Sequence, residues 1–305
     1  MHVADRLQIA VEQTASIACV GLDPRPELLP PKLVEEALAR YGDTDVAVGS
    51  AFTAFNIALL DAIAGHCAAV KPQLACYEAY GLPGWHALIE TVRHARELGL
   101  EVIADGKRND IGSTAAHYGQ AFFGGAPRLG SGRTGGLGAT WATANAYLGS
   151  QGIEPLLAHD QTHGIFVLVR TSNPSAVELQ DQPSGEGTVA DAMAALVHQW
   201  GRERRGRCGL SDIGAVVGAT WPDQARRLRS LMPDTVFLVP GYGAQGGGAM
   251  DAVAGARPGD GGGLLVNSSR GIIGAWQATN SPQAWAEAAR SALDAMNNDL
   301  SAARR

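Results

Sequence analysis

The chain has 305 residues, 46% of them hydrophobic and 18% charged, which is enough to bury a large core and is a usual length for one (β/α)8 barrel. The formal net charge of −6 argues against a nucleic-acid or anionic-membrane partner, because both favour a basic protein face. An anionic substrate would therefore have to be held by a few local cations.

The amino-terminal residues 1–16 mix charged with apolar side chains, which predicts an amphipathic helix rather than a signal peptide. No apolar run approaches the roughly 20 residues that span a bilayer, so we expect no membrane segment. The cysteines form no CxxC pair, which favours a reduced cytoplasmic setting; they are Cys19, Cys67, Cys76 and Cys208.

Short apolar runs rich in Val, Ile and Leu recur along the chain. Their apolarity is continuous rather than alternating, which predicts strands buried on both faces, as in a parallel sheet. The runs occupy residues 17–22, 68–70, 100–104, 139–144, 165–169, 213–219, 235–239 and 263–267.

Helical patterns lie between these runs, with apolar residues at three- and four-residue steps. They cover residues 48–67, 84–99, 189–203, 222–232 and 282–300. Strands that alternate with helices indicate βαβ units, and about eight units predict one closed (β/α)8 TIM barrel over residues 1–305. A doubly wound open sheet is the alternative that strand counting leaves open. The glycine-rich stretch at about 124–138 is expected to be a flexible excursion from the barrel.

Polar side chains follow each apolar run, where the strands of a barrel converge on one mouth. Asp23 follows the first run, Lys71 the second, and Asp105 with Lys107 the third. The later runs are followed by Asn145, by Ser172 and Asn173, by Thr220, by Gln245, and by Ser269 with Arg270. A set that combines carboxylates and cations in this way predicts a binding site.

The segment Asp105–Thr114 contains the pattern D-x-K-x-x-D. If the strand continues through Lys107, the side chains of Asp105 and Lys107 point to the same side, because strand side chains alternate. Asp110 and Thr114 lie four residues apart and would share one helical face if the next helix begins there. For an arbitrary sequence of this kind, a surface ion pair with a capping Asp is the simpler interpretation.

The motifs together resemble those of the orotidine 5′-phosphate decarboxylase family, in its longer-chain bacterial form. The likeness extends over the chain in seven segments with the same order: GLDP at 21–24, KPQLACYEAYG at 71–81, DGKRNDI at 105–111, NAYLG at 145–149, RTSNPSA at 170–176, PGYGAQGG at 240–247 and SSRGI at 268–272. Two positions depart from the family pattern, with Asn109 in place of the usual Gly and Ala146 in place of the usual Pro.

This resemblance implies decarboxylation of orotidine 5′-phosphate to uridine 5′-phosphate in pyrimidine synthesis, without a metal ion or a cofactor. It implies that Lys107 protonates C6 of the pyrimidine and that Asp105 faces the departing carboxylate. Asp23 and Lys71 would hold the ribose hydroxyls, and Lys71 would also bond Asp105. Ser172 would meet the pyrimidine edge, and Gln245 and Arg270 would bind the phosphate. The resemblance also implies a homodimer in which Asp110 and Thr114 reach the neighbour's site.

Three alternatives are compatible with the sequence. Gly241, Gly243 and Gly246 form a G-x-G-x-x-G motif, but a dinucleotide-binding fold needs several further βα units after it, and a barrel phosphate site explains the glycines better. Sugar-phosphate enzymes of related barrels share D-x-K-x-x-D but use Mg²⁺. A barrel that binds nucleotide without turning it over is the third alternative.

Overall fold

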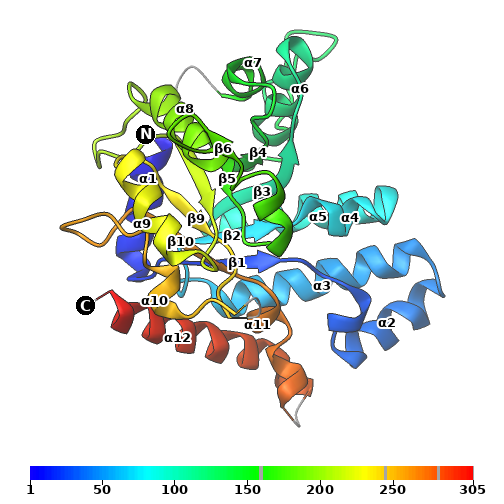
Figure 1. Cartoon of the computed structure of the whole chain (residues 1–305). Coiled ribbons are helices and arrows are strands. Elements are labelled where there is room, and N and C mark those ends of the chain that lie inside the picture. Colours follow the sequence, from blue (N-terminus) through cyan, green and yellow to red (C-terminus); the bar gives the residue numbers. More distant parts are fainter. Residues whose placement is uncertain (158–160, 244–245, 280–281, 305) are drawn as a thin grey trace.

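The computed structural model describes residues 1–157, 161–243, 246–279 and 282–304. Within these residues, eight parallel strands close into a barrel in the order β1, β2, β3, β4, β5, β8, β9, β10 (Figure 1). The strands are β1 (Ala18–Leu22), β2 (Ala69–Pro72), β3 (Glu101–Arg108), β4 (Trp141–Ala144), β5 (Gly164–Arg170), β8 (Ile213–Val217), β9 (Phe237–Val239) and β10 (Leu264–Ser268). Every predicted strand is confirmed.

Closure of the sheet decides between the two architectures that the strand count left open. β10 pairs with β1 in parallel, with Ala18 opposite Val266 and Val20 opposite Ser268. An open doubly wound sheet would leave these two strands as separate edges. The predicted (β/α)8 barrel is therefore confirmed.

The amino-terminal helix α1 (Val3–Thr14) is also confirmed. Its buried residues Val3, Ala4 and Leu7 belong to the same apolar cluster as barrel side chains such as Phe166 and Leu265. Much of this cluster comes from the first residues of the strands, so α1 closes the end of the barrel where the strands begin. The opposite end is left open for a site.

Helices cover the outside of the barrel, and all five predicted internal and carboxy-terminal helices are present with shifted ends. The main helices are α2 (Pro31–Tyr41), α3 (Asp45–Ile63), α4 (Leu74–Glu78), α5 (Gly81–Glu97), α6 (Gly112–Phe123), α8 (Val189–Gly201), α9 (Pro222–Leu231) and α12 (Trp285–Ala303). Single-turn helices are α7 (Ser150–Ile153), α10 (Ala249–Ala252) and α11 (Arg270–Ile273).

The helix α3 corrects one expectation, because its 19 residues are long and apolar enough to cross a membrane by length and composition alone. In the structure α3 packs against α2, α5 and α12. Phe52, Phe55 and Leu59 are fully buried there, and half of the apolar stretch is buried. Core packing against these helices thus explains its apolarity. A search for uninterrupted apolar runs misses α3 because polar residues such as Asp61 interrupt the run.

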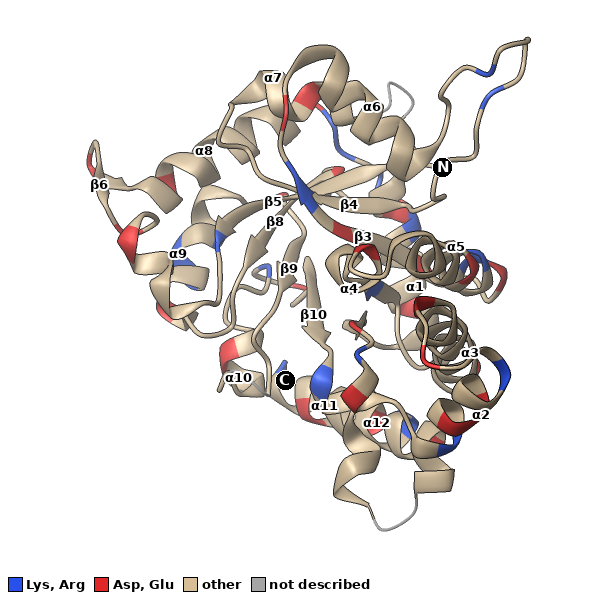
Figure 2. Cartoon of the chain, turned by 90° about the vertical axis from the view of Figure 1, so that its right-hand side faces the viewer, with Lys and Arg blue, Asp and Glu red and all other residues tan. Residues whose placement is uncertain are grey.

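The glycine-rich stretch at 124–138 leaves the barrel after α6 and forms an arm that projects from the body of the molecule (Figure 2). Backbone hydrogen bonds link its two sides, from Gly125 N–H to Thr134 C=O at 2.8 Å and from Arg128 N–H to Gly132 C=O at 2.9 Å. Its two sides also pair at an antiparallel bridge between Pro127 and Arg133. The arm therefore has a hairpin-like backbone path.

A second hairpin lies between β5 and α8, where the strands β6 (Pro183–Ser184) and β7 (Gly187–Thr188) pair antiparallel. Gly185 occupies the turn with φ of 59°, a left-handed conformation that glycine adopts without steric cost. Thr188 then caps α8, because its hydroxyl accepts a hydrogen bond from Asp191 N–H while the Asp191 carboxylate accepts from Thr188 N–H.

The packing of α3 leads to a stability prediction. Phe52 is fully buried and meets the rings of Tyr77 and Tyr80 edge to face, with centroids 6.2 and 5.3 Å away. We expect Phe52→Ala to lower the free energy of unfolding by about 3–5 kcal/mol, because it removes this burial and leaves a cavity. Leu82 is 85% exposed, and Leu82→Ala is the control, with an expected change within about 0.5 kcal/mol. Equal unfolding midpoints in urea for the two variants would contradict the assignment of α3 to the core.

Candidate active site

A cavity of about 330 Å³ opens at the carboxyl ends of the strands. Its wall is built by residues from all eight barrel strands or from the turns that follow them, as in barrel enzymes generally. Figure 2 shows acidic and basic segments side by side on β3. The predicted site residues that line the cavity are Asp23, Lys71, Asp105, Lys107, Ser172 and Arg270.

The Asp105 carboxylate accepts hydrogen bonds from four side chains. Lys71 Nζ donates to Oδ2 at 2.7 Å and Lys107 Nζ donates to Oδ1 at 2.6 Å. Thr143 Oγ1 donates to Oδ1 at 2.8 Å, and Gln73 Nε2 donates to Oδ2 at 3.1 Å. Both oxygens are thus charge-paired and hydrogen-bonded, and we call these five residues the Asp105 cluster.

The backbone of β3 brings Lys107 to this carboxylate. The strand β3 continues through Lys107, which was the condition for the side chains of Asp105 and Lys107 to lie on the same side. Lys107 itself has φ of 46°, an uncommon conformation for a residue with a side chain, and the pairing with β4 shifts register between Ala104 and Arg108. The Lys107 N–H donates to Thr143 Oγ1 at 2.9 Å, so the same hydroxyl holds both the Lys107 backbone and the Asp105 side chain.

Burial and charge act in opposite directions on the cluster. Burial alone would raise the pKa of the Asp105 carboxyl, but the ammonium groups of Lys71 and Lys107 outweigh it and hold that pKa well below its usual range. Burial alone would lower the pKa of Lys71, but the carboxylates of Asp105 and Asp23 raise it above its ordinary value. Asp105 and Lys71 therefore stay ionised at neutral pH although both are almost completely buried.

Asp23 and Asn267 leave polar atoms on this cavity without partners. The Oδ1 atoms of both side chains are buried and accept no hydrogen bond from the described residues. Buried acceptors are normally satisfied, so these two atoms are suited to donors from a bound molecule, such as hydroxyl groups.

The structure does not bring Asp110 and Thr114 to the cavity of their own chain, among the residues that it describes. The helix α6 begins at Gly112, so Asp110 precedes it, and the expectation that the two residues share one helical face is wrong. The Asp110 carboxylate accepts a hydrogen bond from Ile111 N–H at 2.8 Å, while Thr114 is exposed in the first turn. Gln245, predicted to bind phosphate, lies outside the described residues.

Comparisons with known proteins identify the family. Residues 17–286 match the model of the orotidine 5′-phosphate decarboxylase / HUMPS family. The chain belongs to this family. An orotidine 5′-phosphate decarboxylase of Rhodopirellula baltica is 41% identical over 98% of this chain and 99% of its own. Among solved structures, the orotidine monophosphate decarboxylase of Leishmania donovani is 30% identical with a TM-score of 0.75, covering 100% of this chain and 99% of its own.

Several lining residues were missed by sequence reasoning. Gln73 and Thr143 complete the Asp105 cluster, and Arg25, Thr171 and Asn267 also line the cavity. Side chains along a barrel strand point alternately inward and outward. This alternation along β4 was the sequence signal that could have identified Thr143 as facing the cavity. Three polar residues expected at strand ends are not among the described lining residues: Asn145, Asn173 and Thr220. Their side chains instead bond nearby loop atoms, as when Asn145 accepts from Tyr147 N–H at 3.0 Å.

The buried pairing of Asp105 predicts a stability effect. We expect Asp105→Ala to lower the free energy of unfolding by about 3–5 kcal/mol at pH 7, because it leaves the buried Lys71 ammonium without its nearest carboxylate. Because the folded-state pKa of Asp105 lies below its unfolded value, this contribution is fully present above about pH 4 and is lost only as pH falls toward the folded pKa. Urea unfolding measures it, with the exposed Asp43→Ala as control, expected within about 0.5 kcal/mol. Equal effects of the two substitutions would contradict this picture.

Proposed function

We propose that this chain decarboxylates orotidine 5′-phosphate to uridine 5′-phosphate in pyrimidine synthesis. The observation that carries the proposal is the Asp105–Lys107 pair on the cavity wall, in a chain whose full-length relatives are named orotidine 5′-phosphate decarboxylase. The solved structures with the same fold and about 30% identity carry that name as well. The family model also covers the HUMPS enzymes, so orotidine 5′-phosphate decarboxylation has to be distinguished from a Mg²⁺-dependent reaction on a sugar phosphate.

The reaction needs a cation where negative charge develops. When the bond between C6 and the carboxylate breaks, the electron pair stays on C6 in the plane of the ring, where the π system cannot absorb it. The Lys107 ammonium stabilises this pair and then transfers a proton to C6, which leaves CO2 and the product. Asp105, held ionised by its two lysines, faces the departing carboxylate and repels it less as CO2 forms.

The charge of the cavity suits an anionic nucleotide. Its described lining residues contribute four cationic side chains against the two carboxylates of Asp23 and Asp105, whereas the whole chain is acidic; the cations are Arg25, Lys71, Lys107 and Arg270. Arg270 and Gln245 would bind the phosphate after strands β9 and β10, where barrels commonly place it. Asp23 and Lys71 would hold the ribose hydroxyls, and Ser172 would contact the pyrimidine edge. Binding at the phosphate then orients the base for reaction.

The proposed reaction uses no metal ion and no organic cofactor, because the cation at the reacting carbon is the Lys107 side chain. Among the described residues, no group of three or more His, Cys, Asp or Glu is arranged to hold a metal ion. The experiment below tests this part of the proposal directly.

We further propose a homodimer in which Asp110 and Thr114 act in the neighbour's site. Leu148 lies near Asp110, because a Cβ atom at Gly152 would be 3.0 Å from the Asp110 carbonyl oxygen and 3.5 Å from Leu148 Cβ, and Ile111 follows Asp110 in the chain. Ile111 is 49% exposed and Leu148 is 44% exposed, so two exposed apolar side chains lie near Asp110. A second copy of the chain would bury this surface and receive the Asp110 carboxylate.

The deciding experiment follows the ultraviolet absorbance of orotidine 5′-phosphate mixed with purified protein in excess EDTA. The proposal predicts rapid loss of the orotate chromophore with stoichiometric formation of uridine 5′-phosphate. The proposal would be contradicted if the protein instead acted on a sugar phosphate with an activity that EDTA abolishes and Mg²⁺ restores. That result would indicate a Mg²⁺-dependent sugar-phosphate enzyme. Tight binding of uridine 5′-phosphate without turnover of the substrate would indicate a silent nucleotide-binding barrel.

The role of Lys107 predicts a separation of turnover from binding. We expect Lys107→Ala to lower kcat by at least about a thousandfold, because the stabilising cation and the proton donor are lost together. Uridine 5′-phosphate should still bind, since Arg270 and Asp23 remain. Steady-state kinetics and calorimetric titration measure the two quantities. Retention of most of kcat would contradict the mechanism.

The shared site predicts complementation between inactive proteins. Lys107→Ala and Asp110→Ala chains, mixed under conditions of subunit exchange, should regain up to about a quarter of wild-type activity, because each hybrid dimer contains one site with neither substitution. A mixture of Lys107→Ala with Asp105→Ala, which lie in the same site, is the control and should regain none. No recovery in the first mixture, with exchange verified by mass labelling, would contradict the action of Asp110 across the interface.

A further inference from the structure

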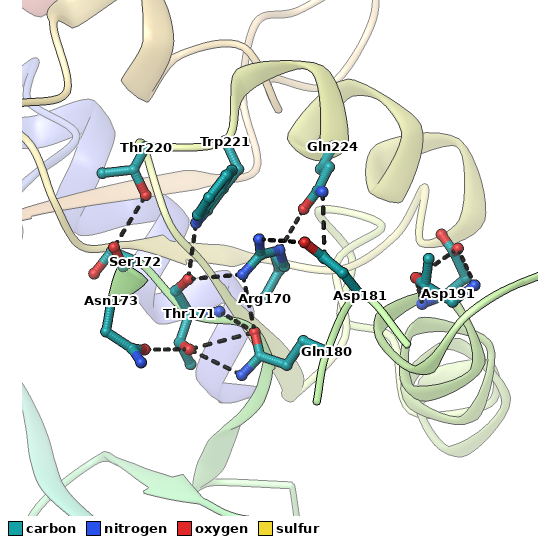
Figure 3. A network of polar contacts seen from close by, with 11 residues as sticks. Arg170, Thr171, Ser172, Asn173, Gln180, Asp181, Asp191, Thr220, Trp221 and Gln224 are labelled. Carbon is teal, nitrogen blue, oxygen red and sulfur yellow. Dashed lines mark hydrogen bonds and ion pairs between the residues drawn. The ribbon is translucent and has the colours of Figure 1, made fainter. Parts of the chain in front are cut away.

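Arg170, the last residue of β5, is completely buried beside the cavity without lining it, among the described residues. Its Nη2 donates to Asp181 Oδ2 at 3.1 Å and its Nε donates to Gln224. Its guanidinium carbon lies 4.0 Å from the ring centroid of Trp221. Figure 3 shows these side chains converging on Arg170 from the start of α9 and from the segment before β6. Arg170 is thus anchored by side chains from two other segments of the chain, directly before the residues that line the cavity.

The following segment, Thr171 and Ser172, forms part of the cavity wall, and we call it the Ser172 wall. Gln180 Oε1 accepts from Thr171 N–H at 2.9 Å and from Arg170 Nη1 at 3.3 Å. The Thr171 carbonyl accepts from Trp221 Nε1 at 3.1 Å, and the Ser172 carbonyl accepts from Thr220 Oγ1 at 3.2 Å. The backbone of the wall is therefore held by side chains from outside the cavity (Figure 3).

Close packing fixes the wall from a further side. A Cβ atom at Gly218 would lie 2.8 Å from both Cα and Cβ of Ser172, which is closer than such atoms approach in proteins. The Gly218 N–H also donates to the Arg170 carbonyl at 2.7 Å. Gly218, the residue after β8, thus limits movement of Ser172 in one direction, while Gln180 and Trp221 hold the backbone of Thr171.

We propose that Gln180, held in place by Arg170, is a positioning residue that sets where Ser172 meets the substrate. This inference rests on the proposed function, because it assigns Gln180 a part in placing the pyrimidine against Lys107. Gln180 touches the wall and not the cavity, among the described residues, so it acts through Thr171 and Ser172. Gln180 Oε1 is suited to this role because it accepts from both the Thr171 N–H and Arg170 Nη1. Its loss leaves the Thr171 N–H without this acceptor and, within the part of the chain that the structure describes, leaves Arg170 Nη1 with only the Thr171 carbonyl at 3.4 Å.

Two substitutions at Gln180 separate its hydrogen bonds from its size. Both substitutions remove the hydrogen bond of 2.9 Å that Gln180 Nε2 donates to the Thr171 hydroxyl. Gln180→Glu keeps an oxygen that accepts from Thr171 N–H and Arg170, whereas Gln180→Met keeps the length and loses this acceptor as well. We expect Gln180→Met to lower kcat about tenfold with KM changed less than about threefold, because the phosphate still anchors the substrate while the base is misplaced. Gln180→Glu should stay within about twofold of wild type. Gln182→Met, at an exposed glutamine two residues along, is the matched control.

A double-mutant cycle with Ser172→Ala tests whether Gln180 acts through the wall. In the Ser172→Ala background, Gln180→Met should lower kcat by less than about twofold further, because the contact that it positions is already gone. The same tenfold loss in both backgrounds, or no loss in the wild-type background, would overturn the proposal. Failure of Gln180→Glu to preserve activity would also overturn it.

Hydrogen–deuterium exchange provides a readout that does not depend on the reaction. In the ligand-free protein, the Thr171 amide should exchange faster in Gln180→Met than in wild type or Gln182→Met, because it loses its side-chain acceptor. Unchanged exchange would overturn the positioning role even in an active enzyme. Faster exchange in a protein that does not decarboxylate orotidine 5′-phosphate would contradict the proposed function and leave the role of Gln180 in holding the wall supported.

Discussion

The site depends on one buried ionic arrangement, in which the Asp105 carboxylate is held between the ammonium groups of Lys71 and Lys107 at 2.7 and 2.6 Å. Burying a carboxylate is unfavourable on its own, because burial opposes its charge. The two ammonium groups reverse this and keep Asp105 ionised. The result is a site with fixed charges that need little rearrangement when a substrate's own charge develops.

The barrel explains how residues from distant parts of the chain meet in this arrangement. Lys71 and Asp105 come from the neighbouring strands β2 and β3, and Thr143 comes from β4 on the other side of Asp105. The strand starts, by contrast, are filled with apolar side chains and closed by α1. The opposite wall, at Ser172, is fixed differently, by the buried Arg170 and the polar side chains around it. Both sides of the cavity are therefore held by polar contacts within the chain.

The barrel and most of the site could be predicted from sequence because continuous apolar runs reveal buried strands and polar residues mark their ends. What could not be predicted depends on local backbone geometry and on tertiary contacts. The φ of 46° at Lys107 and the start of α6 after Asp110 are set by the turn and not by any periodic pattern. Thr143 and Gln73 contribute only through their positions beside Asp105 in the closed sheet. In the sequence, Arg170 is only the first residue of the RTSNPSA motif. Its burial and its partners Asp181, Gln224 and Trp221 are visible only in the structure.

The most direct test of this account is the protonation of Asp105 itself, followed by ¹³C NMR of the side-chain carboxyl in aspartate-labelled protein and assigned with Asp105→Asn. We expect the Asp105 signal to keep its ionised shift from pH 7 down to about pH 4, the ordinary pKa of aspartate, because Lys71 and Lys107 hold its pKa lower. A titration of this signal with a midpoint above about pH 4 would show that burial outweighs the two ammonium groups, and would contradict the account.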